Sequence, residues 1–314
     1  MPYTLDEETL MRLVRCPESA AELECFDSWL YSADEQLYPI ICRTPILAPR
    51  IESFLRKETW SIARAMAEFG EEQEVRSWFF SRYGCLDEGG ATPVDTEVAG
   101  EGYPGFWDCL QIPGFVTELV QQTPEQIVED QISGTRFKMG LDLGCGQGGM
   151  MQRMAAHCDQ VIGVEVNPYL AMLANRHLPA TEIPIRYLVP EDGLSTEILA
   201  KPAVDNGRVI CADVTALPFD EPLFDWIHCG HFLDLSDDPA ALVADIAELL
   251  KPNGLLTITS PLDFSEEDHF EGMFGLLARD FQERFQLDGI PWLRFNHKRR
   301  YVLHEDWVWM GNLD

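Results

Sequence analysis

The stretch Gly140-Leu141-Asp142-Leu143-Gly144-Cys145-Gly146-Gln147-Gly148-Gly149 decides the fold of this chain. It joins a predicted buried strand to a predicted helix. Glycines are needed at such a turn, because the chain bends sharply there and a ligand can approach bare backbone near the helix N-terminus. Gly144, Gly146 and Gly149 also fit the G-x-G-x-x-G pattern of dinucleotide sites, so the glycines alone leave the ligand open.

The chain from about residue 137 onward alternates short apolar runs with helical segments. This alternation is typical of βαβ units around a parallel sheet. Strands are predicted at residues 139–143, 161–165, 208–213, 224–229 and 255–259. A helix at 240–250 is expected to end at Lys251-Pro252-Asn253-Gly254, whose turn feeds the next strand.

The C-terminal part predicts a further helix at about 266–285 and then two extended segments, 292–295 and 300–309. Only four residues separate these segments, so they predict an antiparallel hairpin at the sheet edge. Trp292, Trp307 and Trp309 are assigned to its buried face. The prediction is a doubly wound α/β fold with a mostly parallel seven-stranded sheet and an antiparallel C-terminal hairpin.

Three acidic residues stand where predicted strands end. Glu165 lies about 20 residues after the glycines, where a carboxylate can bind both hydroxyls of a ribose. Asp142 would repel a pyrophosphate but can orient an ammonium group, and Asp213 can accept a hydrogen bond from an adenine amino group. A pocket lined in this way suits a ligand that bears a sulfonium and an ammonium group.

At these residues the chain resembles the class I S-adenosylmethionine-dependent methyltransferases, in particular the branch with quinone-biosynthesis and other small-molecule enzymes. The resemblance covers about residues 137–311. It rests on five ordered features: Asp142 to Gly148, Gly163-Val164-Glu165-Val166, Ala212-Asp213-Val214, Phe224-Asp225-Trp226-Ile227 and Lys251-Pro252-Asn253-Gly254.

The resemblance implies S-adenosylmethionine as cofactor and a role for each matching residue. Asp142, Gly144, Cys145, Gly146 and Gly148 would hold the methionine end, and Glu165 the ribose. Val166 and Val214 would flank the adenine, Asp213 and the Val214 backbone would bind its edge, and Cys229 would lie against the cofactor through backbone atoms.

His231 follows the fourth predicted strand of this region, on the loop that faces substrate in this fold. It is the candidate catalytic residue, because an imidazole titrates near neutrality and can act as a general base. Packing in the loop or contact with the cofactor is the alternative. The expected reaction is direct in-line displacement of the methyl group, in which positioning supplies much of the rate enhancement, so a base is optional.

The chain divides by pattern into residues 1–50, a helical cap or linker region at 51–136, and the cofactor domain at 137–314. The first region resembles a degenerate zinc-ribbon module of the kind that accompanies some RNA methyltransferases. Only Cys16 stands at a ligand position and Ser19 occupies its partner position, whereas a zinc site needs four ligands. We therefore expect no metal, and a docking surface for a protein partner is one possible role of this module.

The net charge of −30 makes bare RNA or DNA an unfavourable substrate and leaves a small molecule as the expected acceptor. No apolar stretch approaches the ~20 residues that cross a bilayer, and the acidic N-terminus lacks a signal-peptide pattern. We expect a cytoplasmic protein without membrane contact. The nine cysteines lack the spacing of a disulfide scaffold, so free thiols are expected.

Two other functions fit parts of the pattern. A partner-binding or regulatory protein could bind the cofactor without turnover, and a nicotinamide-dependent oxidoreductase would fit the glycines but not Asp142. Tyr103, Phe106 and Trp107 could form a lid or an acceptor pocket, or pack in the core. Residues 184–207 are longer than a minimal fold needs, which leaves the local topology open there.

Overall fold

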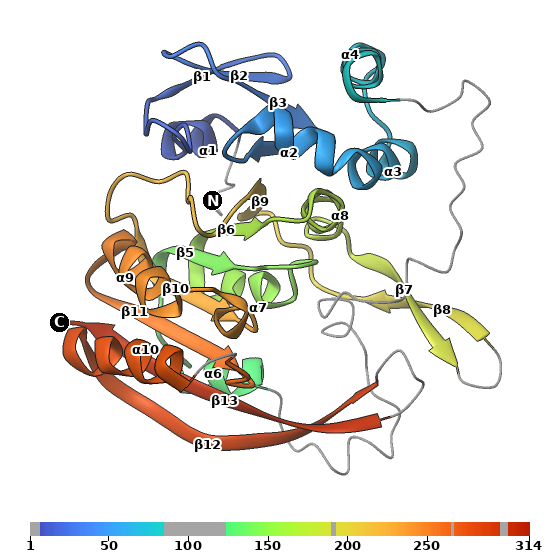
Figure 1. Ribbon diagram of the computed structural model, residues 1–314. Coiled ribbons are helices and arrows are strands. Elements are labelled where there is room, and N and C mark those ends of the chain that lie inside the picture. The colour runs from blue at the N-terminus through green and yellow to red at the C-terminus, as the bar shows by residue number, and fades with distance from the viewer. Residues whose placement is uncertain (1–6, 85–123, 190–192, 265–266, 296–300) are drawn as a thin grey trace.

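The structure is a computed structural model, and it describes residues 7–84, 124–189, 193–264, 267–295 and 301–314. The predicted lid residues Tyr103, Phe106 and Trp107 lie outside these ranges. Eleven strands of the described residues form one mixed sheet in the order β1-β2-β3-β4-β9-β6-β5-β10-β11-β13-β12 (Figure 1).

Seven of these strands form the predicted doubly wound part. The parallel strands are β5 (Phe137–Leu143), β6 (Cys158–Glu165), β9 (Gly207–Ala212), β10 (Phe224–Gly230) and β11 (Leu250–Ser260). β12 (Phe281–Phe295) and β13 (Tyr301–Leu313) add the antiparallel hairpin at one edge, as predicted. The parallel strands are apolar on both faces because helices cover both.

The connecting helices place the ligand site. α7 (Gly149–His157) and α8 (Pro168–His177) lead from β5 to β6 and on to β9, whereas α9 (Pro239–Leu249) leads from β10 to β11 in the opposite direction. Right-handed crossovers therefore put α7 and α8 on one face and α9 on the other. The order reverses between β5 and β10, and the carboxyl ends of these strands are the usual ligand site of such sheets.

Side-chain caps fix where two of these helices begin. Asn167 accepts a hydrogen bond from the Leu170 N–H at the start of α8, and Asp238 accepts one from the Ala241 N–H at the start of α9. Each cap is followed by a proline at the first helical position, where the missing N–H costs nothing. The last turn of α9 ends before Lys251-Pro252-Asn253-Gly254, as predicted.

The N-terminal strands continue the same sheet beyond β9, which the sequence did not predict. After α1 (Glu7–Leu13) come β1 (Leu23–Phe26), β2 (Trp29–Ser32), β3 (Leu37–Ile41) and β4 (Thr44–Leu47). β4 pairs in parallel with β9, Ile46 opposite Cys211 and Leu47 opposite Ala212. Ile46 and Leu47 are fully buried, so this seam is part of the hydrophobic core.

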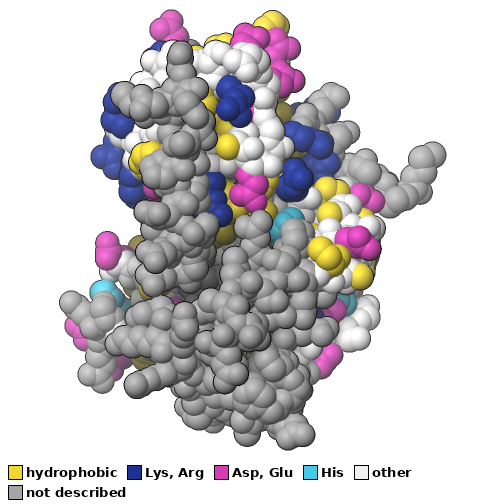
Figure 2. Space-filling model, turned by 90° about the vertical axis from the view of Figure 1, so that its right-hand side faces the viewer, with side chains coloured by type: hydrophobic (Ala, Val, Ile, Leu, Met, Phe, Trp, Pro, Cys, Tyr) yellow, Lys and Arg dark blue, Asp and Glu magenta, His cyan; other side chains and the backbone are white. Residues whose placement is uncertain are grey.

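Three helices join the N-terminal strands to the rest of the molecule: α2 (Ile51–Lys57), α3 (Thr59–Phe69) and α4 (Gln73–Tyr83). α3 packs against α8, and the Arg64 guanidinium lies 4.3 Å from the centre of the Tyr169 ring. Figure 2 shows Lys and Arg side chains gathered over the upper part of one face. Charge is therefore uneven on a protein with a net charge of −30.

The predicted helix at 266–285 is wrong in its last turn. α10 (Glu267–Asp280) ends at Asp280, and β12 begins at Phe281. Phe281 is buried against the Trp309 ring, with 5.8 Å between ring centres, while Gln282 to Arg284 are exposed. Packing on the neighbouring strand therefore overrides local helical periodicity. Trp307 and Trp309 are buried as expected, whereas the Trp292 side chain is not among those described.

The long stretch between the second helix and third strand of the domain contains a separate hairpin. β7 (Glu182–Val189) and β8 (Gly193–Ala200) pair with each other in a two-stranded sheet that projects from the body of the molecule (Figure 1). The insertion leaves the order of the main sheet unchanged. Among the described residues, no helix has the length and apolar character required to cross a membrane.

Candidate functional site

The glycine turn after β5 is held against the end of β6. Gly144, Gly146 and Gly148 have φ angles of +69°, +53° and +86°, a region that favours glycine. The N–H groups of Gly144 and Cys145 donate to the Val164 carbonyl at 2.9 and 3.0 Å. The sequence therefore needs glycines here for conformation as well as for ligand access.

Close packing behind the turn requires one more glycine. A Cβ on Gly163 of β6 would collide with Met151 Sδ and would lie 2.8 Å from Cys145 Sγ. Real side chains do not approach so closely, so the Met151 and Cys145 side chains would have to shift. Gly163 thus leaves room for the Met151 and Cys145 side chains against β6.

Glu165 links the turn to the next loop. Its Oε2 accepts a hydrogen bond from Gly146 N at 3.0 Å, and its Oε1 accepts one from Asn167 N at 2.8 Å. Burial raises the pKa of this carboxyl, and the hydrogen bonds from Asn167 and Gly146 partly oppose that shift. Glu165 is therefore a structural acceptor in addition to any contact with a ligand.

Asp142 lies on β5 and is 2 % exposed. It pairs in register with Gly163 on one side and with His228 of β10 on the other. Opposite residues in neighbouring strands point to the same face, so Asp142 and His228 share the face that α7 covers. The structure thus brings a buried carboxylate beside the strand-order switch point.

Asp213 follows β9 and forms a local turn. Its Oδ1 accepts hydrogen bonds from the N–H and the hydroxyl of Thr215 at 2.9 and 2.8 Å. Val214 is partly buried against the core, whereas Val166, after β6, is 48 % exposed. Val166 and Val214 therefore follow the carboxyl ends of the neighbouring strands β6 and β9, and Asp213 precedes Val214.

The cysteines of the site are buried thiols. Burial raises the pKa of Cys145 well above its usual range, with further contributions from Asp142 and Glu165. Burial also raises the pKa of Cys229 on β10, and Asp142 adds to the shift. Neither residue is a thiolate near neutral pH, and none of the seven cysteines in the described part of the chain forms a disulfide.

His228 belongs to a buried polar chain that sequence reasoning missed. Trp226 Nε1 donates to Thr257 Oγ1 at 2.9 Å, and the same hydroxyl lies 2.9 Å from His228 Nδ1. Because the indole N–H only donates, the hydroxyl can give its own proton to Nδ1, and the imidazole then carries its proton on Nε2. Burial lowers the pKa of His228 to about 4, so the ring is neutral.

His231 faces an acid from a distant part of the chain. Its Nε2 lies 3.5 Å from Oε1 of Glu125, which is on α6 (Pro124–Gln131). The two side chains are 26 % and 18 % exposed. The sequence contains no local pattern that links Glu125 to His231, because about a hundred residues separate them.

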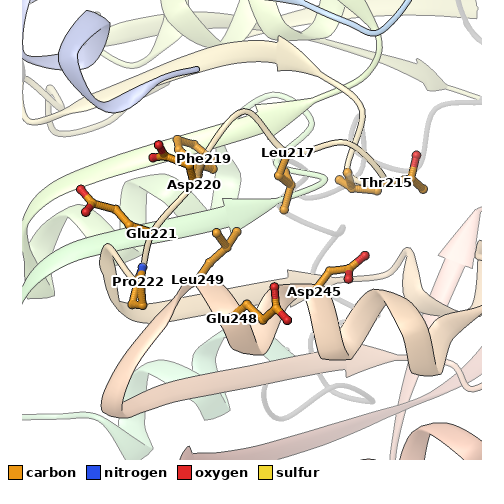
Figure 3. Close-up of a pocket in the computed structure, with 10 residues that line it drawn as sticks. Thr215, Leu217, Phe219, Asp220, Glu221, Pro222, Asp245, Glu248 and Leu249 are labelled. Atoms are coloured by element: carbon orange, nitrogen blue, oxygen red, sulfur yellow. The ribbon is translucent and has the colours of Figure 1, made fainter. Parts of the chain in front are cut away.

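A groove of about 440 Å³ lies beside the end of β9. Figure 3 shows that the segment after β9 and the helix α9 supply its lining side chains. Val214 and Thr215 are among the residues that line the groove, as are four carboxylates: Asp220, Glu221, Asp245 and Glu248. Such a lining disfavours an anionic ligand.

The N-terminal module holds polar side chains at the positions expected for zinc ligands. Cys16 Sγ lies 3.2 Å from Tyr38 Oη. Burial would raise the pKa of Cys16, but hydrogen bonds with Ser19 and Tyr38 outweigh it and the net shift is downward. Hydrogen bonds from Ser32 and Ser19 lower the pKa of Asp34. Among the described residues, no group of three or more His, Cys, Asp or Glu could hold a metal.

Comparisons with known proteins agree with this geometry. A family model described as a methyltransferase domain matches residues 141–258. The chain carries a methyltransferase domain. It is of the S-adenosylmethionine-dependent class, and the match spans the glycine turn, Glu165, Asp213 and β10.

Curated relatives match at low identity. The ubiquinone biosynthesis O-methyltransferase of Coxiella burnetii (strain RSA 493 / Nine Mile phase I) is 28% identical over 138 residues, 44% of this chain and 49% of the relative. The 24-methylenesterol C-methyltransferase 2 of Arabidopsis thaliana is 22% identical over 231 residues, 71% of this chain and 56% of the relative. The chain thus spans about half the length of the curated relatives it matches.

Solved structures match part of this chain at low similarity. The N-methyltransferase NodS from Bradyrhizobium japonicum WM9 is 14% identical, with a TM-score of 0.44, and the match covers 65% of this chain and 99% of NodS. The two curated relatives above methylate oxygen and carbon by their names. The atom that this chain methylates therefore has to be argued from its own residues.

The residues present fit S-adenosylmethionine. Gly144 is exposed, so backbone is open to a ligand at the turn. The acids Asp142, Glu165 and Asp213 lie at the carboxyl ends of β5, β6 and β9, which are neighbours in the sheet. Carboxylates suit the ammonium group, the ribose hydroxyls and the adenine amino group of this cofactor.

Proposed function

We propose that this protein transfers the methyl group of S-adenosylmethionine to a small-molecule acceptor. The observation that carries the proposal is the set of three carboxylates and the open glycine turn at the carboxyl ends of three adjacent strands. The O-methyltransferase relatives support an acceptor of small size.

The proposed roles follow the positions of the residues. Asp142 and the turn from Gly144 to Gly148 bind the methionine end of the cofactor. Glu165 binds the ribose with the lone pairs that its two backbone bonds leave unused. The remaining contacts are with the adenine and the methyl-bearing end, and they come from Val166, Asp213, Val214 and the backbone of Cys229.

When bound, the cofactor supplies an electrophilic methyl group on a positively charged sulfur. The chain must orient the acceptor for in-line attack and remove any proton that the acceptor loses. Orientation alone can contribute about 7–11 kcal/mol to the rate enhancement. His231, at the end of β10, is the proposed proton acceptor.

Charge supports a small acceptor over a nucleic acid. A net charge of −30 repels a phosphate backbone, and four carboxylates line the groove that includes Val214. A neutral molecule, or one with a positive charge, meets no such barrier.

We further propose that residues 1–50 derive from a zinc-ribbon module whose metal has been replaced by hydrogen bonds. Cys16, Tyr38, Ser19 and Asp34 form contacts of this kind. One edge of the module pairs with β9 of its own chain. Any protein partner would therefore bind to another part of the module.

Methyl-labelled S-adenosylmethionine and a panel of small acceptors test the proposed activity. The panel should include phenols, catechols, amines and carbon acids, and products should be identified by mass spectrometry. We expect label in at least one small molecule and none in RNA. Label recovered in RNA, or cofactor binding without transfer to any small molecule, would contradict the proposal.

A further inference from the structure

The ion pair between His231 and Glu125 joins two elements that are far apart in the chain. His231 follows β10, and Glu125 lies in the first turn of α6. α6 packs on α7, β11 and β13, so it covers the same face of the sheet as α7. One member of the ion pair, His231, therefore follows a strand of the sheet, and the other, Glu125, lies on the helix that covers it.

The backbone of His231 is held in an unusual conformation. Its φ angle is +55°, a region in which histidine is more common than most residues but still rare. Its N–H donates to the Thr259 carbonyl at 2.7 Å, which ties the loop to the end of β11. Such strain persists where the surroundings over-determine it, which is common at functional sites.

The same loop touches the cofactor turn. A Cβ on Gly144 would lie 3.1 Å from Cδ1 of Phe232, so the Phe232 ring rests against the glycine turn. His231 is the neighbouring residue. Because Phe232 contacts the turn proposed to hold the methyl donor, the backbone of His231 lies close to that turn.

Other titratable groups around the pair come from three elements. His228 of β10 is neutral, and Asp142 of β5 lies opposite it in register. Asp234, in the short helix η3 (Leu233–Leu235), accepts a hydrogen bond from the Ser260 hydroxyl at 2.9 Å. Glu125 is thus the acid that faces the His231 ring directly, whereas Asp234 is bonded to Ser260.

We propose that Glu125 is a positioning residue that fixes the tautomer of His231 and makes it the proton acceptor for a neutral hydroxyl substrate. This inference rests on the proposed methyl transfer. With Nε2–H directed at Glu125, the lone pair of the ring is on Nδ1. A hydroxyl acceptor needs such a base, because it is neutral near pH 7 and its oxygen must lose a proton as it is methylated.

The proposed step transfers a methyl group and a proton. The acceptor oxygen forms a bond to the methyl carbon, and the carbon–sulfur bond breaks with its electron pair on sulfur, which leaves as a neutral thioether. The hydroxyl proton moves to Nδ1 of His231. The resulting imidazolium is stabilised by the Glu125 carboxylate and later releases its proton to solvent.

The test measures the imidazole directly, on full-length protein labelled with ¹⁵N-histidine. Long-range ¹H–¹⁵N spectra recorded as a function of pH give the tautomer and the pKa of each ring, and His231→Asn identifies the His231 signals. Asn tolerates the same backbone region, so the loop should keep its shape. We expect the Nε2–H tautomer in the unmodified protein.

Glu125→Gln should lower the pKa of His231 by about one unit, because an opposite charge at this distance favours the protonated ring. Glu125→Asp should restore part of the shift. Glu129→Gln is the matched control: Glu129 is on the same helix, where it pairs with Arg153 at 2.6 Å and faces His157 at 3.9 Å. Equal His231 titrations in the Glu125→Gln and Glu129→Gln proteins would overturn the proposal.

Cofactor binding on the same samples separates this inference from the proposed function. If S-adenosylmethionine fails to bind the unmodified protein, the function is wrong whatever the imidazole does. If it binds equally to all variants and His231 does not respond to Glu125, the positioning role alone is wrong. In the acceptor panel, label on a hydroxyl oxygen supports the inference, and label only on nitrogen or carbon, or on no compound, contradicts it.

Discussion

Glu165 accepts a hydrogen bond from the backbone N–H of Gly146 at 3.0 Å, so a side chain at the end of β6 holds the glycine turn that follows β5. The other carboxylate oxygen holds Asn167, the N-cap of α8. One carboxylate therefore fixes two loops that border the proposed cofactor site.

Glu165→Ala should loosen both loops and weaken cofactor binding. One buried and one partly buried N–H group lose their acceptor, and hydrogen bonds to a charged group contribute about 1.5–3 kcal/mol each. We expect faster amide hydrogen exchange at Gly146 and Asn167, and affinity for S-adenosylmethionine reduced at least about tenfold. Asp159→Ala, at the opposite end of the same strand, is the control, and equal exchange in both variants would contradict the assigned role.

Asn175 should be essential for the seam between β4 and β9. Its side-chain amide donates to Thr44 Oγ1 and to the Val209 carbonyl at 2.8 Å, and its Oδ1 accepts from Val209 N at 2.9 Å. The amide thus replaces a strand partner for Val209, just before β4 begins to pair with β9.

Asn175→Asp keeps the shape but removes both donors and places a carboxylate oxygen against a carbonyl. We expect a loss of about 2–4 kcal/mol in the free energy of unfolding by urea, since unsatisfied buried groups cost about 1–3 kcal/mol each. Thr44→Val, which removes the bond with Asn175 and a longer one to the Cys42 carbonyl, should cost about 1 kcal/mol. If the two variants lose equal stability, Asn175 does not act as the missing strand partner.

Acid should destabilise the protein through its buried histidines. The pKa of His228 is lowered from 6.5 to about 4 by burial, so the native state excludes a proton that the unfolded chain binds. The stability from the neutral ring is present above pH 6.5 and is lost as the pH falls toward 4. His177 has the same shift, caused by burial and then by Lys201 and Arg176.

His228→Asn tests this through the slope of stability against pH. Between about pH 6 and pH 4.5, the unmodified protein should lose about 1.4 kcal/mol per pH unit more than the variant, which corresponds to one proton. Urea denaturation at four pH values gives both slopes. His177 is present in both proteins, so its contribution cancels, and parallel curves would show that His228 is not the titrating group.

The N-terminal module should fold without metal. Cys16, Ser19, Ser32 and Asp34 form hydrogen bonds where a ribbon would hold zinc. We expect much less than one equivalent of zinc in purified protein by mass spectrometry, and a melting temperature unchanged by chelator. Stoichiometric zinc, or a chelator that lowers the melting temperature, would contradict this account.

The sequence predicted where the three acidic residues of the candidate site lie in the sheet. Asp142, Glu165 and Asp213 each end an apolar run, and the carboxyl ends of parallel strands meet at one edge. Glu125 could not be found in this way, because its position beside His231 arises only when α6 packs across the sheet. His228 was missed for a related reason, since its partner Thr257 comes from the next strand.

The fold was predictable where helix and strand periods are clear. The apolar residues of the Phe281–Phe285 segment suit a helical turn as well as a strand. The segment forms a strand because it pairs with β13 and Phe281 packs against Trp309. The pairing of β4 with β9 depends on two residues from each strand, too short a signal to predict a shared sheet.

Isothermal titration with S-adenosylmethionine tests the central claim most directly. The unmodified protein should bind one equivalent, and Asp142→Ala and Asp213→Ala should each bind about tenfold to a hundredfold more weakly, as expected for a lost charge-assisted hydrogen bond. Asp159→Ala should bind like the unmodified protein. Undiminished affinity in both the Asp142→Ala and Asp213→Ala proteins would contradict the site described for this domain.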